Sequence, residues 1–143
     1  MERALELAEG AGRQGEVPVG AVVLDEFLTV VGEGANARVR RSDPTAHAEI
    51  EALRAAGARL GSSRLAGCTL VVTLEPCAMC AGAAVAARLE RVVFGAWDEK
   101  AGACGSVWDL TRDRMSLHVV EVVPGLYADR AAGQLRNFFA SRR

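Results

Sequence analysis

The 143-residue sequence predicts an α/β fold, a three-layer α/β/α sandwich around a five-stranded mixed sheet. Helical and strand patterns alternate in the order α-β-β-α-β-α-β-α-β-α, which is typical of a sheet with helices on both faces. The first two strand patterns are separated by only a few residues, which favours an antiparallel hairpin. About 20 residues separate the last two, enough for a short crossover helix between parallel strands. The sheet is therefore expected to be mixed.

Each element is predicted from helical periodicity, apolar β-rich runs and start or stop residues. Asp43 is the expected N-cap of the second helix and Gly57 its end, while Pro76 opens the third helix. The run GCTLVVTLE is continuously apolar, as in a strand covered on both faces. The predicted elements are a helix over 1–14, strands over 17–25 and 28–34, a helix within 42–57, a strand over 67–75, a helix over 76–90, strands over 91–98 and 117–123, and a helix over 129–143.

The composition is that of a globular protein, with 50% hydrophobic and 24% charged residues. The chain is long enough to form one domain, residues 1–143, without disulfides. No apolar run approaches the roughly 20 residues that span a bilayer, and the segment after Met1 is helical rather than a signal peptide. We therefore expect a cytoplasmic protein with reduced cysteines and no membrane partner.

Arginines cluster in three segments, although the net charge is only −1. These are 38–41, 111–114 and 141–143. Arginine suits bidentate contacts with phosphates and stacking on bases, but such clusters are also common as solvated surface charge. Each cluster by itself is compatible with both interpretations.

His47, Cys77 and Cys80 are the candidate metal ligands. The two cysteines are three residues apart on a predicted helix, so their sulfurs lie on one face near its N-terminus, where thiolates are favoured. His47 lies at the start of another helix, and both helices are expected at one edge of the sheet. One imidazole and two thiolates form a ligand set suited to zinc.

Glu49 is the candidate catalytic residue, because a carboxylate close to a zinc ligand can carry protons for hydrolysis. Two residues apart on an ideal helix, Glu49 would point away from His47. The arrangement therefore requires His47 to stand at the helix boundary, with non-helical dihedral angles. We predict that boundary.

The number of ligands distinguishes a structural zinc site from a catalytic one. A structural site is closed by four protein ligands, whereas a catalytic site keeps one position for water. Cys68, Cys104 and His118 are the possible fourth ligands, and each has an ordinary explanation as a residue of the core. Three clear ligands and a nearby glutamate indicate a catalytic site. The combination H-x-E…P-C-x-x-C is the signature known for zinc nucleobase deaminases.

The sequence resembles the bacterial tRNA adenosine deaminases of the cytidine deaminase superfamily over nearly its whole length. The resemblance includes "EVPVGAV", "GEGANARVRRSDPTAHAEIEALR", "TLEPCAMCAGA", "RVVFGAWDEKAGACGS" and "NFFASRR". It implies a cytidine deaminase-like fold and hydrolytic deamination of adenosine to inosine at the tRNA wobble position. By this resemblance one Zn²⁺ per subunit activates a water, Glu49 shuttles the protons, and the Ala48 N–H helps to hold the intermediate.

The resemblance also suggests how a flipped adenine would be bound. Asn36 would form hydrogen bonds with the base, Val17 and Phe138 would form apolar walls, and Asp98 would contact the neighbouring ribose. The less favoured alternative for Asn36 is a turn residue, and the alternative for Asp98 is a cap at the end of a strand. Phe138 is followed by Phe139, which faces about 100° away on a helix, so one of the two is expected in the core.

The partners implied by the resemblance are a tRNA and a second copy of the chain. Lys100, Arg142 and Arg143 would bind phosphates of the anticodon stem-loop, which is expected to belong to an arginine tRNA. Family members are homodimers, and the small-residue helix that begins at Pro76 can form such an interface. Trp97 and Trp108 can stack either on bases or on the partner subunit.

Two other functions remain open at the level of sequence. The same zinc chemistry can deaminate a free base or nucleoside such as guanine or cytosine, although a small substrate needs no arginine clusters. A non-catalytic nucleic-acid-binding zinc module would need a fourth ligand and would make Glu49 dispensable.

Overall fold

The computed structural model describes residues 1–143, the whole chain. Helices and strands follow the predicted order with two differences: one additional short helix follows the first hairpin, and the helix expected between the last two strands is absent. The elements are α1 (Glu2–Arg13), β1 (Gly20–Leu24), β2 (Val30–Ala35), α2 (Arg38–Arg41), α3 (Ala48–Leu60), β3 (Thr69–Leu74), α4 (Ala78–Ala86), β4 (Arg91–Ala96), β5 (Glu121–Val123) and α5 (Ala128–Ala140).

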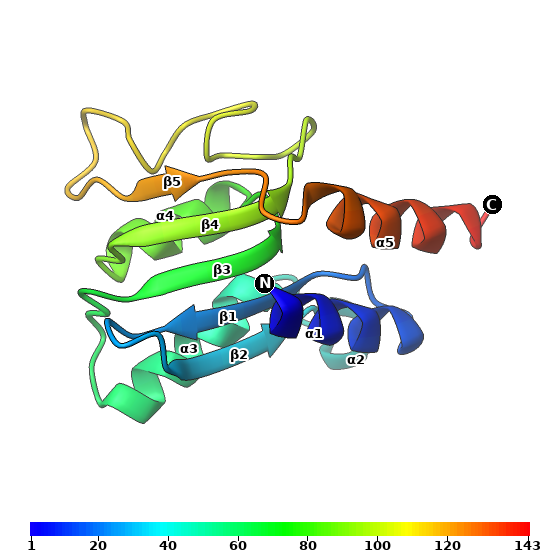
Figure 1. Ribbon diagram of the computed structural model, residues 1–143, viewed down its shortest axis with the longest axis horizontal. Helices are drawn as coiled ribbons and strands as arrows, with labels where there is room; N and C mark the ends of the chain where they lie inside the picture. Colours follow the sequence, from blue (N-terminus) through cyan, green and yellow to red (C-terminus); the bar gives the residue numbers. More distant parts are fainter.

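The five strands form one mixed sheet in the order β2-β1-β3-β4-β5. Strand β1 is antiparallel to both β2 and β3, whereas β3, β4 and β5 are parallel to one another. Helices α3 and α4 cover one face of the sheet, and α1 and α5 lie on the other (Figure 1). The predicted sandwich, the hairpin and the parallel last pair of strands are confirmed.

Two glycines of β2 bring α3 close to the sheet. A Cβ atom at Gly32 or Gly34 would collide with backbone atoms of α3, at Ala52 and Ala56 or at Ala48 and Ala52. Because the contact is between backbones, the first turn of α3 has a closely defined position above the end of β2. This helix begins with the candidate catalytic residues.

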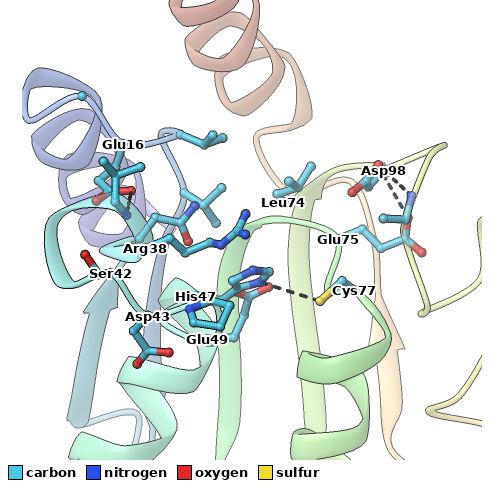
Figure 2. Close-up of a pocket in the computed structure, with 17 residues that line it drawn as sticks. Glu16, Arg38, Ser42, Asp43, His47, Glu49, Leu74, Glu75, Cys77 and Asp98 are labelled. Atoms are coloured by element: carbon cyan, nitrogen blue, oxygen red, sulfur yellow. Dashed lines mark hydrogen bonds between the residues drawn. The ribbon is translucent and has the colours of Figure 1, made fainter.

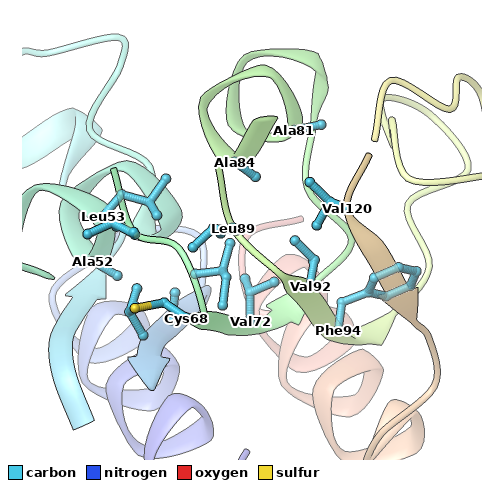
Figure 3. Packing of buried hydrophobic residues seen from close by; sticks show 14 of the residues in the cluster. Ala52, Leu53, Cys68, Val72, Ala81, Ala84, Leu89, Val92, Phe94 and Val120 are labelled. Carbon is cyan, nitrogen blue, oxygen red and sulfur yellow. The ribbon is translucent and has the colours of Figure 1, made fainter. Parts of the chain in front are cut away.

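The main core lies between the sheet and helices α3 and α4. Its largest members include Phe94, Leu70 and Leu89, and alanines of both helices complete the contact (Figure 3). None of the helices has the length and apolar character needed to cross a membrane.

The boundaries of α3 differ from those expected. Asp43 is not its N-cap; its Oδ1 atom instead accepts hydrogen bonds from the Thr45 N–H and hydroxyl in a local turn. His47 is the residue before the helix, with φ −78° and ψ 151°, so the predicted boundary at His47 is confirmed. The helix continues past Gly57 to Leu60 and ends at Gly61, whose positive φ of 62° suits glycine.

The connection from β4 to β5 contains no helix, contrary to the prediction. It is a long loop of turns, with one isolated bridge from Gly102 to Cys77 outside the loop and one within the loop between Cys104 and Asp109. The last strand is also shorter than the expected 117–123, because β5 pairs only over Glu121–Val123. Residues 117–120 are part of the same β-rich run but do not join the strand, because no partner strand pairs with them.

The hairpin between β1 and β2 turns without glycine. The Asp25 carboxylate accepts hydrogen bonds from the N–H groups of Phe27 and Thr29, both at 2.9 Å. Leu28 adopts a positive φ of 63°. The Asp25 side chain thus organises a turn that contains no glycine.

Candidate active site

The three candidate ligands meet at the N-termini of α3 and α4. His47 directly precedes α3, Cys77 directly precedes α4, and Cys80 lies in the first turn of α4. The Nδ1 atom of His47 is 3.7 Å from the Cys77 sulfur and 3.6 Å from the Cys80 sulfur. Strands β2 and β3 flank β1 and are both antiparallel to it, so their carboxyl ends lie at one edge of the sheet and bring together residues 30 or more positions apart.

These distances fit a tetrahedral zinc ion. With ordinary zinc–nitrogen and zinc–sulfur bond lengths, nitrogen and sulfur ligands stand about 3.6 Å apart. The ligand atoms of all three residues lie within 4.8 Å of one another. The donor set and its spacing thus suit one Zn²⁺.

The possible fourth ligands do not join this group. Cys68 and Cys104 are buried in the core, and the Nε2 atom of His118 lies 2.6 Å from the Leu89 carbonyl oxygen. The His118 ring thus has a hydrogen-bond partner. It is only partly buried, so the expectation that it belongs to the core was wrong. With three protein ligands, one coordination position is left for water, as in a catalytic site.

Hydrogen bonds among the three candidate ligands shift their pKa values. The hydrogen bond from the Cys80 thiol lowers the pKa of Cys77 to about 3, and the same bond raises the pKa of Cys80. Hydrogen bonding with Cys77 also raises the pKa of His47. A metal that replaces the shared protons would bind the cysteines as thiolates and the histidine as neutral imidazole.

Glu49 lies in the first turn of α3 and is only 4% exposed. Its side chain lines the same pocket as His47 and Cys77 (Figure 2). Burial raises the pKa of its carboxyl to about 7. A group with such a pKa can both accept and donate a proton near neutral pH, which a proton shuttle requires.

The pocket has a volume of about 520 Å³, ample for a purine. Its base is formed by His47, Glu49 and Cys77, and Leu74 and Val17 supply apolar walls. Val17 therefore lies where an apolar wall was predicted. The pocket opens between the loop before α3 and the loop after β4 (Figure 2).

Asn36 also lines this pocket and is bonded to the catalytic helix. Its Oδ1 atom accepts a hydrogen bond of 3.0 Å from the backbone N–H of Ala48. The Asn36 side-chain NH₂ has no partner in the protein and is available for a base. The Ala48 N–H is occupied by Asn36 in this structure, so its role in holding an intermediate would require that bond to be exchanged.

The loop after β4 carries Asp98 to the edge of the pocket. One Asp98 carboxylate oxygen, Oδ1, accepts hydrogen bonds from the N–H groups of Lys100 and Ala101, so Asp98 also caps a turn. Lys100 is exposed and lines an adjoining depression with Val17 and Trp97. Asp98 and Lys100 thus border the site, and their contacts with RNA remain predictions.

The two phenylalanines of α5 face different depressions. Phe138 lies outside the main pocket, where its ring is 3.7 Å from the guanidinium carbon of Arg142. Phe139 is 50% exposed and lines the depression that contains Lys100. Neither ring is in the core, so that expectation was wrong. Phe139 lies nearer the pocket than Phe138, while Arg143 ends the chain and is exposed.

Glu16, Arg38 and Glu75 are among the residues that line the pocket without having been predicted as site residues. The buried Glu16 carboxylate accepts hydrogen bonds from the N–H groups of Val39 and Arg40 in α2. Arg38 extends over the pocket from that helix (Figure 2). Two signals in the sequence could have identified the glutamates: Glu16 directly precedes VPVG, and Glu75 directly precedes the P-C-x-x-C motif.

Known proteins with similar sequences contain the same type of site. Residues 1–96 match the model of the cytidine and deoxycytidylate deaminase zinc-binding region. A tRNA-specific adenosine deaminase of Haemophilus influenzae is 48% identical over the whole chain, which covers 83% of that protein.

Solved structures of deaminases have a similar fold. A structure from a study of tRNA:A34 deaminases superimposes with a TM-score of 0.91 and 41% identity, covering 94% of this chain and 97% of the other. A guanine deaminase from Nitrosomonas europaea gives a TM-score of 0.82 and 28% identity, covering 97% of this chain and 82% of the other. With its three-ligand centre and its extensive match to H. influenzae deaminase, the chain belongs to the cytidine and deoxycytidylate deaminase zinc-binding family and, within it, to the tRNA-specific adenosine deaminases.

Proposed function

We propose that this protein hydrolyses adenosine to inosine and ammonia at the wobble position, nucleotide 34, of a tRNA anticodon. The observation that carries the proposal is the open three-ligand centre, with buried Glu49 beside it in a purine-sized pocket. The similarity to tRNA-specific adenosine deaminases supports the choice of substrate. Zinc bound by His47, Cys77 and Cys80 supplies an acidified water as the nucleophile.

The protein's own groups would bind the base and move the protons. Glu49 takes a proton from the attacking water and transfers it to the ring nitrogen. It then takes the remaining water proton from the new hydroxyl group on C6 and delivers it to the departing amino group. Burial keeps its pKa near 7, so both directions of transfer are accessible. The free NH₂ of Asn36 would donate to the purine, while Val17 and Leu74 contact its faces.

The remaining contacts would hold the anticodon loop. In the proposal Asp98 accepts a hydrogen bond from a ribose 2′-hydroxyl, and Lys100, Arg142 and Arg143 bind phosphates. Phe138 would provide an apolar contact. We further propose that the substrate is an arginine tRNA, that the protein acts in the cytoplasm, and that it works as a homodimer through α4, whose Met79 is 36% exposed.

A guanine deaminase activity is the second candidate, because a guanine deaminase shares this fold with a TM-score of 0.82. The pocket could hold a free purine without any RNA contact. Exposed basic and aromatic residues beside the pocket, such as Lys100 and Phe139, favour the larger substrate, since a free base would not reach them.

The test is deamination measured by mass spectrometry, as inosine from adenosine, xanthine from guanine and uracil from cytosine. The substrates are an arginine-tRNA anticodon stem-loop with adenosine at the wobble position, free adenosine, guanine and cytosine. We expect inosine only in the stem-loop, and loss of activity by a factor of about 10² to 10⁴ in Glu49→Gln with zinc still bound. Deamination of guanine with an untouched stem-loop would replace the proposal by the second candidate.

A further inference from the structure

Glu75 has a buried carboxylate that the chemistry described above does not use. It directly follows β3, lies two residues before the ligand Cys77, and is only 1% exposed. It is not one of the metal-binding group. A charge buried in this way is costly unless it is fully hydrogen-bonded, so its partners indicate its role.

All three partners are backbone N–H groups of one loop, residues 98–106. The Oε2 atom accepts from Asp98 at 3.0 Å, and Oε1 accepts from Cys104 at 3.0 Å and from Ser106 at 3.1 Å. The side chain extends from the metal-ligand segment toward this loop (Figure 2). The loop is therefore folded around the carboxylate.

The same loop contacts the two residues that follow Glu75. The Ala103 N–H donates to the Pro76 carbonyl at 2.8 Å, and Gly102 forms a bridge with the ligand Cys77. A Cβ atom at Gly102 would collide with the Glu75 carboxylate and with the Ser106 hydroxyl. Segment 75–77 is thus both part of the metal centre and the support on which loop 98–106 rests.

This loop presents Asp98 and Lys100 beside the pocket, and the Asp98 carboxylate shapes the turn between them. We infer that Glu75 is a positioning residue, which fixes loop 98–106 relative to the metal centre so that Asp98 and Lys100 meet the RNA while the adenine occupies the pocket. The inference concerns the substrate side of the reaction and rests on the proposed function. Glu75 is not one of the candidate metal ligands, and both of its carboxylate oxygens are hydrogen-bonded to the loop.

The alternative is that Glu75 only stabilises the fold. Glu75→Gln separates the two roles, because its NH₂ cannot accept a hydrogen bond and places a donor against a backbone donor. If the variant folds poorly, Gly102→Ala provides a second test, since it keeps the glutamate but forces a methyl group between its carboxylate and the loop. Val92→Ala, in the core part of β4, is the control for general destabilisation.

The experiment measures zinc content, kcat and KM on the stem-loop, and hydrogen exchange of individual amides. For Glu75→Gln and Gly102→Ala we expect one zinc per chain, kcat within about twofold of wild type and KM raised about tenfold, as for a misplaced binding group. The Asp98, Cys104 and Ser106 amides should lose protection in Glu75→Gln and keep it in Val92→Ala. In an Asp98→Ala, Lys100→Ala background, Glu75→Gln should no longer change KM.

An unchanged KM in both loop variants, with these amides still protected, would overturn the inference. So would a KM increase of equal size in Val92→Ala. If the wild-type protein does not deaminate the stem-loop, the proposed function fails. The exchange pattern then still decides whether Glu75 holds the loop.

Discussion

The Asn36 Oδ1 atom accepts a hydrogen bond of 3.0 Å from the backbone N–H of Ala48, in the first turn of the catalytic helix. Asn36 follows β2, and Ala48 lies between the ligand His47 and Glu49. One side chain thus joins the pocket wall to the segment that carries both the metal ligand and the proton shuttle. Its oxygen has a structural role, while its NH₂ is free to bind substrate.

Substitution of Asn36 should separate these two roles. Asn36→Asp keeps the acceptor for Ala48 but loses the donor, so we expect a melting temperature near wild type and kcat/KM lowered about tenfold or more. Asn36→Ala loses both contacts and leaves the buried Ala48 N–H unpaired, which should also cost about 1–3 kcal/mol of stability. Thermal melting and stem-loop kinetics measure the two effects. Equal stability losses in both variants would contradict the division of roles.

Zinc content should depend on only two of the four cysteines. Cys77→Ala and Cys80→Ala each remove a ligand, so we expect loss of stoichiometric zinc and of activity. Cys68→Ala and Cys104→Ala should retain one zinc per chain, because these buried thiols lie outside the ligand group. Metal analysis after dialysis provides the measurement. Loss of zinc from Cys104→Ala would instead reveal a fourth ligand and a closed site.

We expect a side chain at Gly34 to disrupt the packing of α3 on β2. Gly34→Ala places a Cβ against the backbone of α3 at Ala48 and Ala52, so we expect a loss of about 1–3 kcal/mol or more. Activity per folded molecule should also fall, since the first turn of α3 carries Glu49. Gly82→Ala is the matched control on α4, where the added Cβ meets open space and should be neutral or stabilising. Denaturant unfolding compares the two variants.

Acid should weaken the ion pair between α1 and β2. The Arg3 guanidinium donates to both Glu33 carboxylate oxygens, at 2.8 and 2.9 Å, and these bonds lower the pKa of Glu33 below its usual 4.5. A lowered folded-state pKa contributes stability above pH 4.5, and this contribution is lost as the pH falls through the folded value.

Glu33→Gln should therefore lower the melting temperature slightly at neutral pH and have no effect at low pH, where the wild-type carboxyl is protonated. The change should be small, because the pair is partly exposed. Melting curves from about pH 3 to about pH 7 test this, with the exposed Glu26→Gln as control. A difference from wild type that grows as the pH falls would show the opposite sign.

The order of elements, the mixed sheet and the ligand set were predictable because they depend on local patterns. Alternating apolar runs, the proline before Cys77 and the spacing of the C-x-x-C motif are all short-range features. The boundary at His47 was also predictable, since only an extended residue there allows His47 and Glu49 to serve one site. These features depend on residues that are close together in the sequence, so they can be recognised without the fold.

Only the tertiary structure decided how the pocket is completed. Asp43 was expected to cap a helix, but its carboxylate is used in a local turn, and the helix starts at the residue that packing and the metal site require. The β4–β5 connection formed no helix because segment 75–77 and the Glu75 carboxylate offer its backbone other hydrogen-bond partners. Likewise the direction of Phe138 and Phe139 depends on where α5 lies against α1 and the sheet.

The sequence by itself determined the chemistry of this protein, because His47, Glu49, Cys77 and Cys80 have the types and spacing that zinc-dependent deamination needs. The tertiary structure determined which other residues line the pocket around these four. Glu16 and Arg38 line the pocket from outside the two ligand motifs, and only folding places them beside the metal ligands. The physical reason is that these contacts exist only after the sheet has brought the loops together.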